Sequence, residues 1–137
     1  MIQVFFSERG SGKSKNLISL ANEKALNCKG NLVYIDDDNK RMLHLNKKIR
    51  FISMDDFKLE SYEQVYGFLC GIISRDFDIE NIYLDGVCNL TTNMESEEAS
   101  RYFNKLEKLT KKFCVNVFIN LHQQSDKLPE YIKKYVA

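Results

Sequence analysis

The segment S7-E-R-G-S-G-K-S14 separates a short apolar run, residues 2–6, from a pattern of apolar residues at helical spacing between Leu17 and Ala25. The run predicts a β-strand and the pattern predicts an α-helix. A strand, a loop of small residues and a helix direct several backbone N–H groups, and the positive end of the helix dipole, at one point. The segment therefore predicts a loop that binds phosphate groups.

Within this loop, Lys13 has the position expected to reach the β- and γ-phosphates of a nucleotide, and Ser14 the position expected to ligate Mg²⁺. Ser7 stands where such loops usually begin with glycine, and a serine fits there unless the position needs a positive φ. The residues that we expect to bind the nucleotide are Glu8, Arg9, Gly10, Ser11, Gly12, Lys13, Ser14 and Lys15.

Strand-like and helical patterns alternate along the rest of the chain. Strands are expected at residues 2–6, 32–35, 51–52, 82–84 and 115–121, with helices at 17–29, 61–73 and 96–113 and a closing helix from Pro129 through Tyr135. This alternation predicts one α/β domain over residues 1–137, with three α/β/α layers and about five mainly parallel strands. Gly67 and Gly71, four residues apart, predict close packing of their helix on the sheet.

Composition restricts the classes of partner. A formal charge of +1 gives no general attraction to nucleic acid or to anionic lipid, and no apolar run is long enough to span a membrane. We therefore expect neither nucleic acid nor a membrane as partner.

The cysteines form no CxxC pair. This predicts buried free thiols in a reducing cytoplasm and argues against a zinc site with His44 or His122. The cysteines are Cys28, Cys70, Cys88 and Cys114.

Carboxylates follow two of the expected strands, and ligands of parallel sheets bind at the carboxyl ends of strands. Asp85 ends the fourth strand and is predicted to hold Mg²⁺ together with Ser14; the alternative is an aspartate that begins a turn. Gly86 stands where many ATPases have a second acidic residue. Asp37 and Asp38 are the candidates to orient or deprotonate water in its place, unless they form a solvated turn.

Three segments in this order, VFFSERGSGKS, VYIDDDN and IYLDG, resemble the RecA-type branch of P-loop ATPases. The resemblance implies the strand order 3-2-4-5-1 and puts Asp38 at the position of the catalytic glutamate. It also puts Leu121 at the position of a glutamine that senses the γ-phosphate, with Asn120, His122 or Gln123 as replacements. The whole chain is similar to small stand-alone bacterial P-loop proteins that are often labelled ATP-binding or PilT-like (twitching motility).

These features together predict a Mg²⁺-dependent ATP-binding protein that acts as a slow ATPase, with Lys13, Asp37 and Asp38 in catalysis. Two alternatives remain: a nucleotide-dependent switch or binding module that does not hydrolyse, and a small-molecule kinase of the nucleoside-kinase type. Arg9, Arg41 or Arg50 could contact the transferred phosphate. The implied order leaves the first strand near a sheet edge, which the last helix, an unknown protein partner or a second copy in a homodimer is expected to cover.

Overall fold

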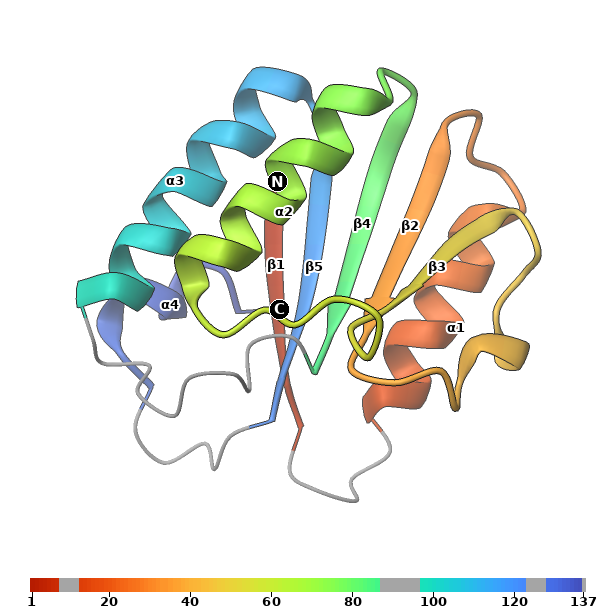
Figure 1. Ribbon diagram of the computed structural model, residues 1–137, viewed down its shortest axis with the longest axis horizontal. Helices are drawn as coiled ribbons and strands as arrows, with labels where there is room; N and C mark the ends of the chain where they lie inside the picture. Colours follow the sequence, from red (N-terminus) through yellow and green to blue (C-terminus); the bar gives the residue numbers. More distant parts are fainter. Residues whose placement is uncertain (8–12, 87–96, 123–127, 137) are drawn as a thin grey trace.

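The computed structural model describes residues 1–7, 13–86, 97–122 and 128–136, which form one sheet with helices on both faces (Figure 1). In chain order, the elements of these residues are β1 (Ile2–Ser7), α1 (Lys13–Ala25), β2 (Asn31–Asp36), a 3₁₀ turn η1 (Met42–His44), β3 (Ile49–Ser53), α2 (Tyr62–Arg75), β4 (Ile79–Asp85), α3 (Glu97–Phe113), β5 (Asn116–His122) and α4 (Glu130–Lys133). The chain is thus α/β, as expected.

All neighbouring strands of the five-stranded sheet are parallel, in the order β1-β5-β4-β2-β3. Read from its β3 edge, the same sheet runs 3-2-4-5-1, which is the order that the sequence resemblance implies. Because every strand points the same way, the carboxyl ends of all strands meet at one edge of the sheet, the lower edge in Figure 1.

The two faces of the sheet bury separate apolar clusters, which explains the three layers. On one face, Leu17 and Ala21 of α1 pack in a cluster with Tyr34 and Tyr83 of the sheet. On the other, α2 and α3 lie side by side and share the larger cluster. In the described part of the chain, no helix has both the length and the apolar character needed to cross a membrane.

The C-terminal segment covers the exposed edge of β1. The backbone N–H of Val4 donates to the carbonyl of Tyr135 at 2.7 Å, and Val4 forms a parallel bridge with Val136. Ile132 of α4 is fully buried in the core. The prediction of a closing helix through Tyr135 was wrong in extent, because α4 ends at Lys133, and the chain then turns and meets β1 at Val136.

Two predictions about small side chains were wrong. Cys114 is exposed, in a turn with φ of 55°, and Cys28 and Cys70 are only half-buried; Cys88 lies outside the described residues. Gly67 and Gly71 are on the exposed face of α2, where an added Cβ would meet no atom within 4 Å. Their spacing therefore does not serve close packing.

The open space at Gly71 leads to a stability prediction. Gly71→Ala should raise the free energy of unfolding by about 0.5–1 kcal/mol, because alanine loses less backbone entropy in a helix and nothing obstructs its methyl group. Denaturant unfolding measures this change. A destabilised variant would mean that another group packs against this face of α2.

Candidate functional site

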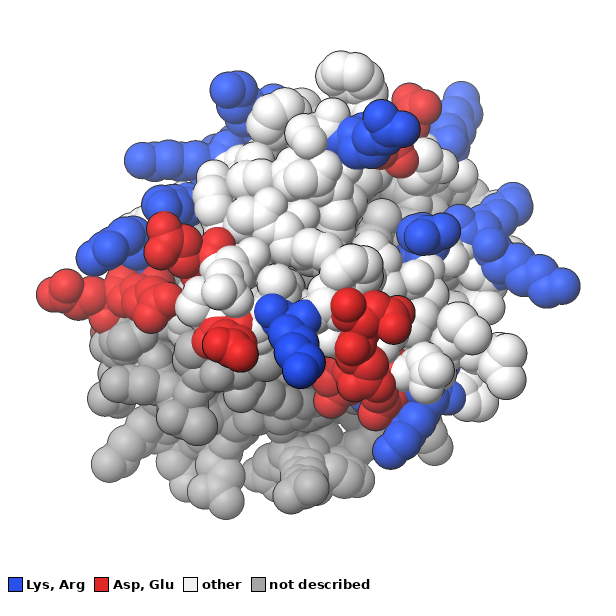
Figure 2. Space-filling view, in the orientation of Figure 1, with Lys and Arg blue, Asp and Glu red and all other residues white. Residues whose placement is uncertain are grey.

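Polar side chains form a row across the carboxyl edge of the sheet. Asp36 pairs in register with Asp85, and Asp85 with Asn120, so these three residues project from neighbouring strands on the α1 side of the sheet. All three are buried, with at most 1% of their surface exposed. On the face shown in Figure 2, most acidic side chains lie in the lower half, toward this edge.

An aromatic row lies directly beneath the polar row and supports it. Its rings stack across four strands with centroid separations of 5.0–6.3 Å: Phe118, Tyr83, Tyr34 and Phe51. Because strands repeat every two residues on one face, Phe118, Tyr83 and Tyr34 each stand two positions before a residue of the polar row, and Phe51 stands two positions before Ser53.

Asp85 accepts hydrogen bonds at both carboxylate oxygens. The hydroxyl of Tyr34 donates to Oδ2 at 2.9 Å, and Nδ2 of Asn120 donates to Oδ1 at 3.1 Å. Burial, and then the charge of Asp85, raise the pKa of Tyr34 well above its ordinary value. The tyrosine hydroxyl therefore remains protonated and acts as a donor to Asp85.

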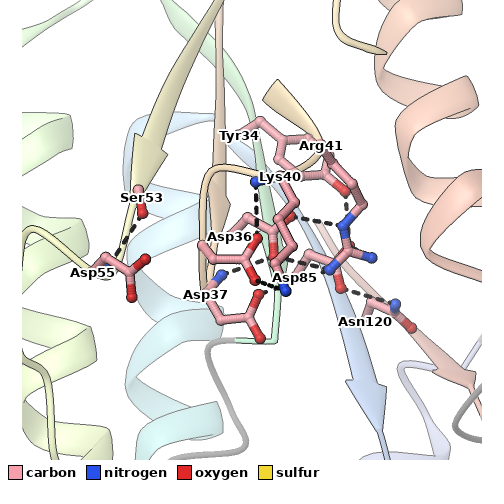
Figure 3. A network of polar contacts seen from close by, with 10 residues as sticks. Tyr34, Asp36, Asp37, Lys40, Arg41, Ser53, Asp55, Asp85 and Asn120 are labelled. Carbon is pink, nitrogen blue, oxygen red and sulfur yellow. Dashed lines mark hydrogen bonds and ion pairs between the residues drawn. The ribbon is translucent and has the colours of Figure 1, made fainter. Parts of the chain in front are cut away.

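Arg41, from the turn before η1, extends over both buried carboxylates (Figure 3). Its Nε and Nη2 donate to Asp36 at 3.1 and 3.3 Å, and its Nη1 lies 3.8 Å from Oδ2 of Asp85. We call Asp36, Asp85 and Arg41 the aspartate–arginine cluster. Desolvation, then Asp37 and Asp85, raise the pKa of Asp36 to about 8, although Arg41 acts in the opposite direction.

The side chain of Asp37 lies beside Gly86, the residue that follows Asp85. Gly86 has φ of +75°, and a Cβ at this position would lie 3.0 Å from Cγ of Asp37. A side chain at position 86 would thus be strained in its backbone and obstructed by Asp37. Asp37 thus has its carboxyl group beside position 86, and this group also lies 3.8 Å from Arg41.

Asp38 has local partners instead. Its Oδ1 accepts the backbone N–H of Lys40 at 2.9 Å, and its Oδ2 lies 3.8 Å from Nζ of the same lysine. These contacts are those of an aspartate that stabilises a turn. Of the two carboxylates predicted to act on water, Asp37 is the one beside the aspartate–arginine cluster.

Most of the predicted phosphate loop lies outside the description. Residues 8–12 are outside the described ranges, and of Lys13, Ser14 and Lys15 only the backbone is described, as the first turn of α1. The described flanks end at Ser7 of β1 and resume at Lys13 of α1. Glu8, Arg9, Gly10, Ser11, Gly12, Lys13, Ser14 and Lys15 therefore all stay predictions as nucleotide ligands.

Leu121, at the expected sensor position, faces away from the site. It is buried in the cluster beneath α2 and α3, whereas its neighbour Asn120 is in the polar row. Of the replacements considered, Asn120 is the one that contacts Asp85; the side chain of His122 and all of Gln123 lie outside the description.

Sequence reasoning did not select Asp36, Tyr34 or Arg41 as partners of Asp85. Asp36 is two residues after Tyr34 and therefore on the same face of the sheet, but the run before it shows no alternation that would tell which face this is. Nothing in the sequence pattern indicates that Arg41 turns back over the strand end.

Among the described residues, the donor set at this edge consists of two carboxyl groups, fewer than a metal site made of protein ligands alone would need. Asp36 and Asp85 offer carboxylate oxygens at a place that already holds a cationic guanidinium. Within residues 1–7, 13–86, 97–122 and 128–136, no group of three His, Cys, Asp or Glu side chains is placed to hold a metal ion. Mg²⁺ is commonly held by one or two carboxylates together with water and substrate phosphates.

Comparisons with known proteins assign no family. No protein-family model matches this sequence, and no curated protein matches it. The geometry of the site and the sequence motif therefore carry the functional argument.

The raised pKa of Asp36 predicts a pH dependence of stability. A carboxyl group whose pKa is higher in the folded than in the unfolded state stabilises the fold below its unfolded pKa, and this stabilisation is lost as the pH rises toward about 8. The free energy of unfolding should fall between about pH 4 and 8, by about 1.4 kcal/mol for each unit of pKa difference.

Urea unfolding of the wild type and of Asp36→Asn across this range tests the assignment. The variant should lose most of the dependence, while Asp56→Asn, at an exposed position, should keep it. Equal slopes in the wild type and Asp36→Asn would show that Asp36 titrates normally.

Proposed function

We propose that this chain is a Mg²⁺-dependent ATP-binding protein that hydrolyses ATP slowly. The observation that carries the proposal is the place of the aspartate–arginine cluster. It lies at the carboxyl edge of a parallel sheet, at the same edge where β1 ends and the segment SERGSGKS leads into α1. Ligands of open α/β sheets bind at this edge.

In this proposal, the loop amides and Lys13 bind the β- and γ-phosphates, while Ser14 and Asp85 hold Mg²⁺. The cation would offset phosphate charge. Tyr34 and Asn120 would orient Asp85 for Mg²⁺ binding, because each of them donates a hydrogen bond to one of its carboxylate oxygens. ATP over other nucleotides follows from the sequence resemblance alone.

For hydrolysis, Asp37 would orient the attacking water and accept its proton. The water oxygen bonds to the γ-phosphorus, the bond to the oxygen bridging to the β-phosphate breaks, and ADP and inorganic phosphate result. Two observations support Asp37 in this role: its side chain borders Gly86, next to Asp85, and about half of its surface is exposed to solvent.

A nucleotide-dependent switch without hydrolysis is the second candidate. Two observations favour it: Leu121 is buried away from the site, and Arg41 already engages the carboxylates. The small-molecule kinase has no such support in the described residues.

Nucleotide binding is tested by titrating ATP in the presence of Mg²⁺ by calorimetry. Lys13→Ala should weaken binding about tenfold or more, because a hydrogen bond to a charged group contributes about 1.5–3 kcal/mol. Lys24→Ala is the matched control at the exposed last turn of the same helix and should bind as the wild type does. Absence of ATP binding by the wild type would reject the proposal.

Turnover is tested separately by phosphate release. Asp37→Asn should lower kcat about 100-fold while ATP binding persists, since a positioned base contributes at least about that factor. Asp38→Asn should have a smaller effect, because Asp38 is bound to its own turn. If the wild type and Asp37→Asn both bind ATP but release phosphate only at the background rate, the protein is a nucleotide-dependent switch and not an ATPase.

A further inference from the structure

Among the side chains that the structure describes, the guanidinium of Arg41 faces both buried carboxyl groups of the cluster. Its Nε is 3.1 Å from Oδ2 of Asp36, and its Nη1 is 3.8 Å from Oδ2 of Asp85. Neither carboxylate has exposed surface, so water does not separate their charges. The guanidinium of Arg41 therefore lies where it stabilises negative charge on these two carboxyl groups.

Arg41 is held less firmly than the carboxylates it faces. Asp36 and Asp85 belong to paired strands, whereas Arg41 lies in the turn between β2 and η1. Its side chain keeps 29% of its surface exposed, and the distance to Asp85 is longer than a hydrogen bond. Rotation about its own side-chain bonds can therefore carry the guanidinium into solvent while the strands stay in place.

A divalent cation and this guanidinium would compete for the same carboxylates. Two positive charges at one position repel each other, and Arg41 donates to both oxygens of Asp36 and lies 3.8 Å from Oδ2 of Asp85. Cation binding at Asp85 thus requires the guanidinium to withdraw.

We propose that Arg41 is an exchangeable internal cation. In the metal-free protein its guanidinium donates to Asp36 and faces Asp85, and it leaves them when a divalent cation binds. The link to a nucleotide rests on the proposed function, whereas the exchange itself concerns the metal alone. Only molecules in which this ion pair is open can bind the metal. The apparent metal affinity is therefore the intrinsic affinity multiplied by the fraction of molecules with an open ion pair.

The direct test is Mn²⁺ binding without nucleotide, followed by electron paramagnetic resonance. Arg41→Met should unfold at a lower temperature than the wild type without metal, yet bind Mn²⁺ about tenfold more tightly, because its carboxylates have lost their internal competitor. Its thermal midpoint should also rise more on addition of Mn²⁺. Arg75→Met removes an exposed arginine at the end of α2 and should match the wild type in each measurement.

A structural ion pair alone would give a different result. Arg41→Met would then be less stable and would bind Mn²⁺ no more tightly than the wild type, and this outcome overturns the proposal. The double variant Arg41→Met with Asp85→Asn should lose the gain in affinity. A gain that survives in the double variant would place the metal elsewhere and would also overturn it.

If Arg41→Met does not fold, the wild type supplies the test by NMR during a Mg²⁺ titration. The Nε–H signal of Arg41 should move toward the position of an exposed arginine as the carboxyl carbon of Asp85 shifts. An unchanged Arg41 signal, or no shift at Asp85, overturns the exchange. Failure of ATP binding with exchange intact would reject only the proposed nucleotide function, so the two failures are distinguishable.

Discussion

The parallel register of β2, β4 and β5 puts Asp36, Asp85 and Asn120 side by side, so two carboxylates are buried next to each other. Taking carboxylates out of water is costly, and buried ion pairs seldom add net stability. The surrounding groups offset this cost: Tyr34 and Asn120 donate to Asp85, and Arg41 pairs with Asp36. Burial of this cluster therefore adds little net stability to the fold.

The aromatic row gives this polar row a rigid base. Stacked rings on neighbouring strands restrict one another, and Tyr34 connects the two rows, since its ring stacks on Tyr83 while its hydroxyl donates to Asp85. A side chain that is fixed at both ends loses little further freedom when a ligand arrives. The orientation of Asp85 is thus set by the core of the sheet rather than by loops.

The sequence was sufficient for the α/β class, the parallel sheet and the place of Asp85, because apolar runs alternate with helical patterns and end in acidic residues. It was insufficient for Asp36 and Asp37. The run ahead of them is buried on both faces, so it shows no alternation of polar and apolar residues from which to read their directions. Contacts that depend on turns, such as Arg41 over Asp85 or Asp37 against Gly86, have no periodic signal.

The edge position of β1 also has a consequence for how the chain folds. Ile2 pairs with Val117, and Val4 with Ile119 and Val136, so the first strand is completed by some of the last residues described. Such non-local pairing is slow to form, because a long loop must close before any contact offsets its entropy. On the ribosome, β1 therefore emerges long before its partner and spends that time as an apolar segment with an open edge.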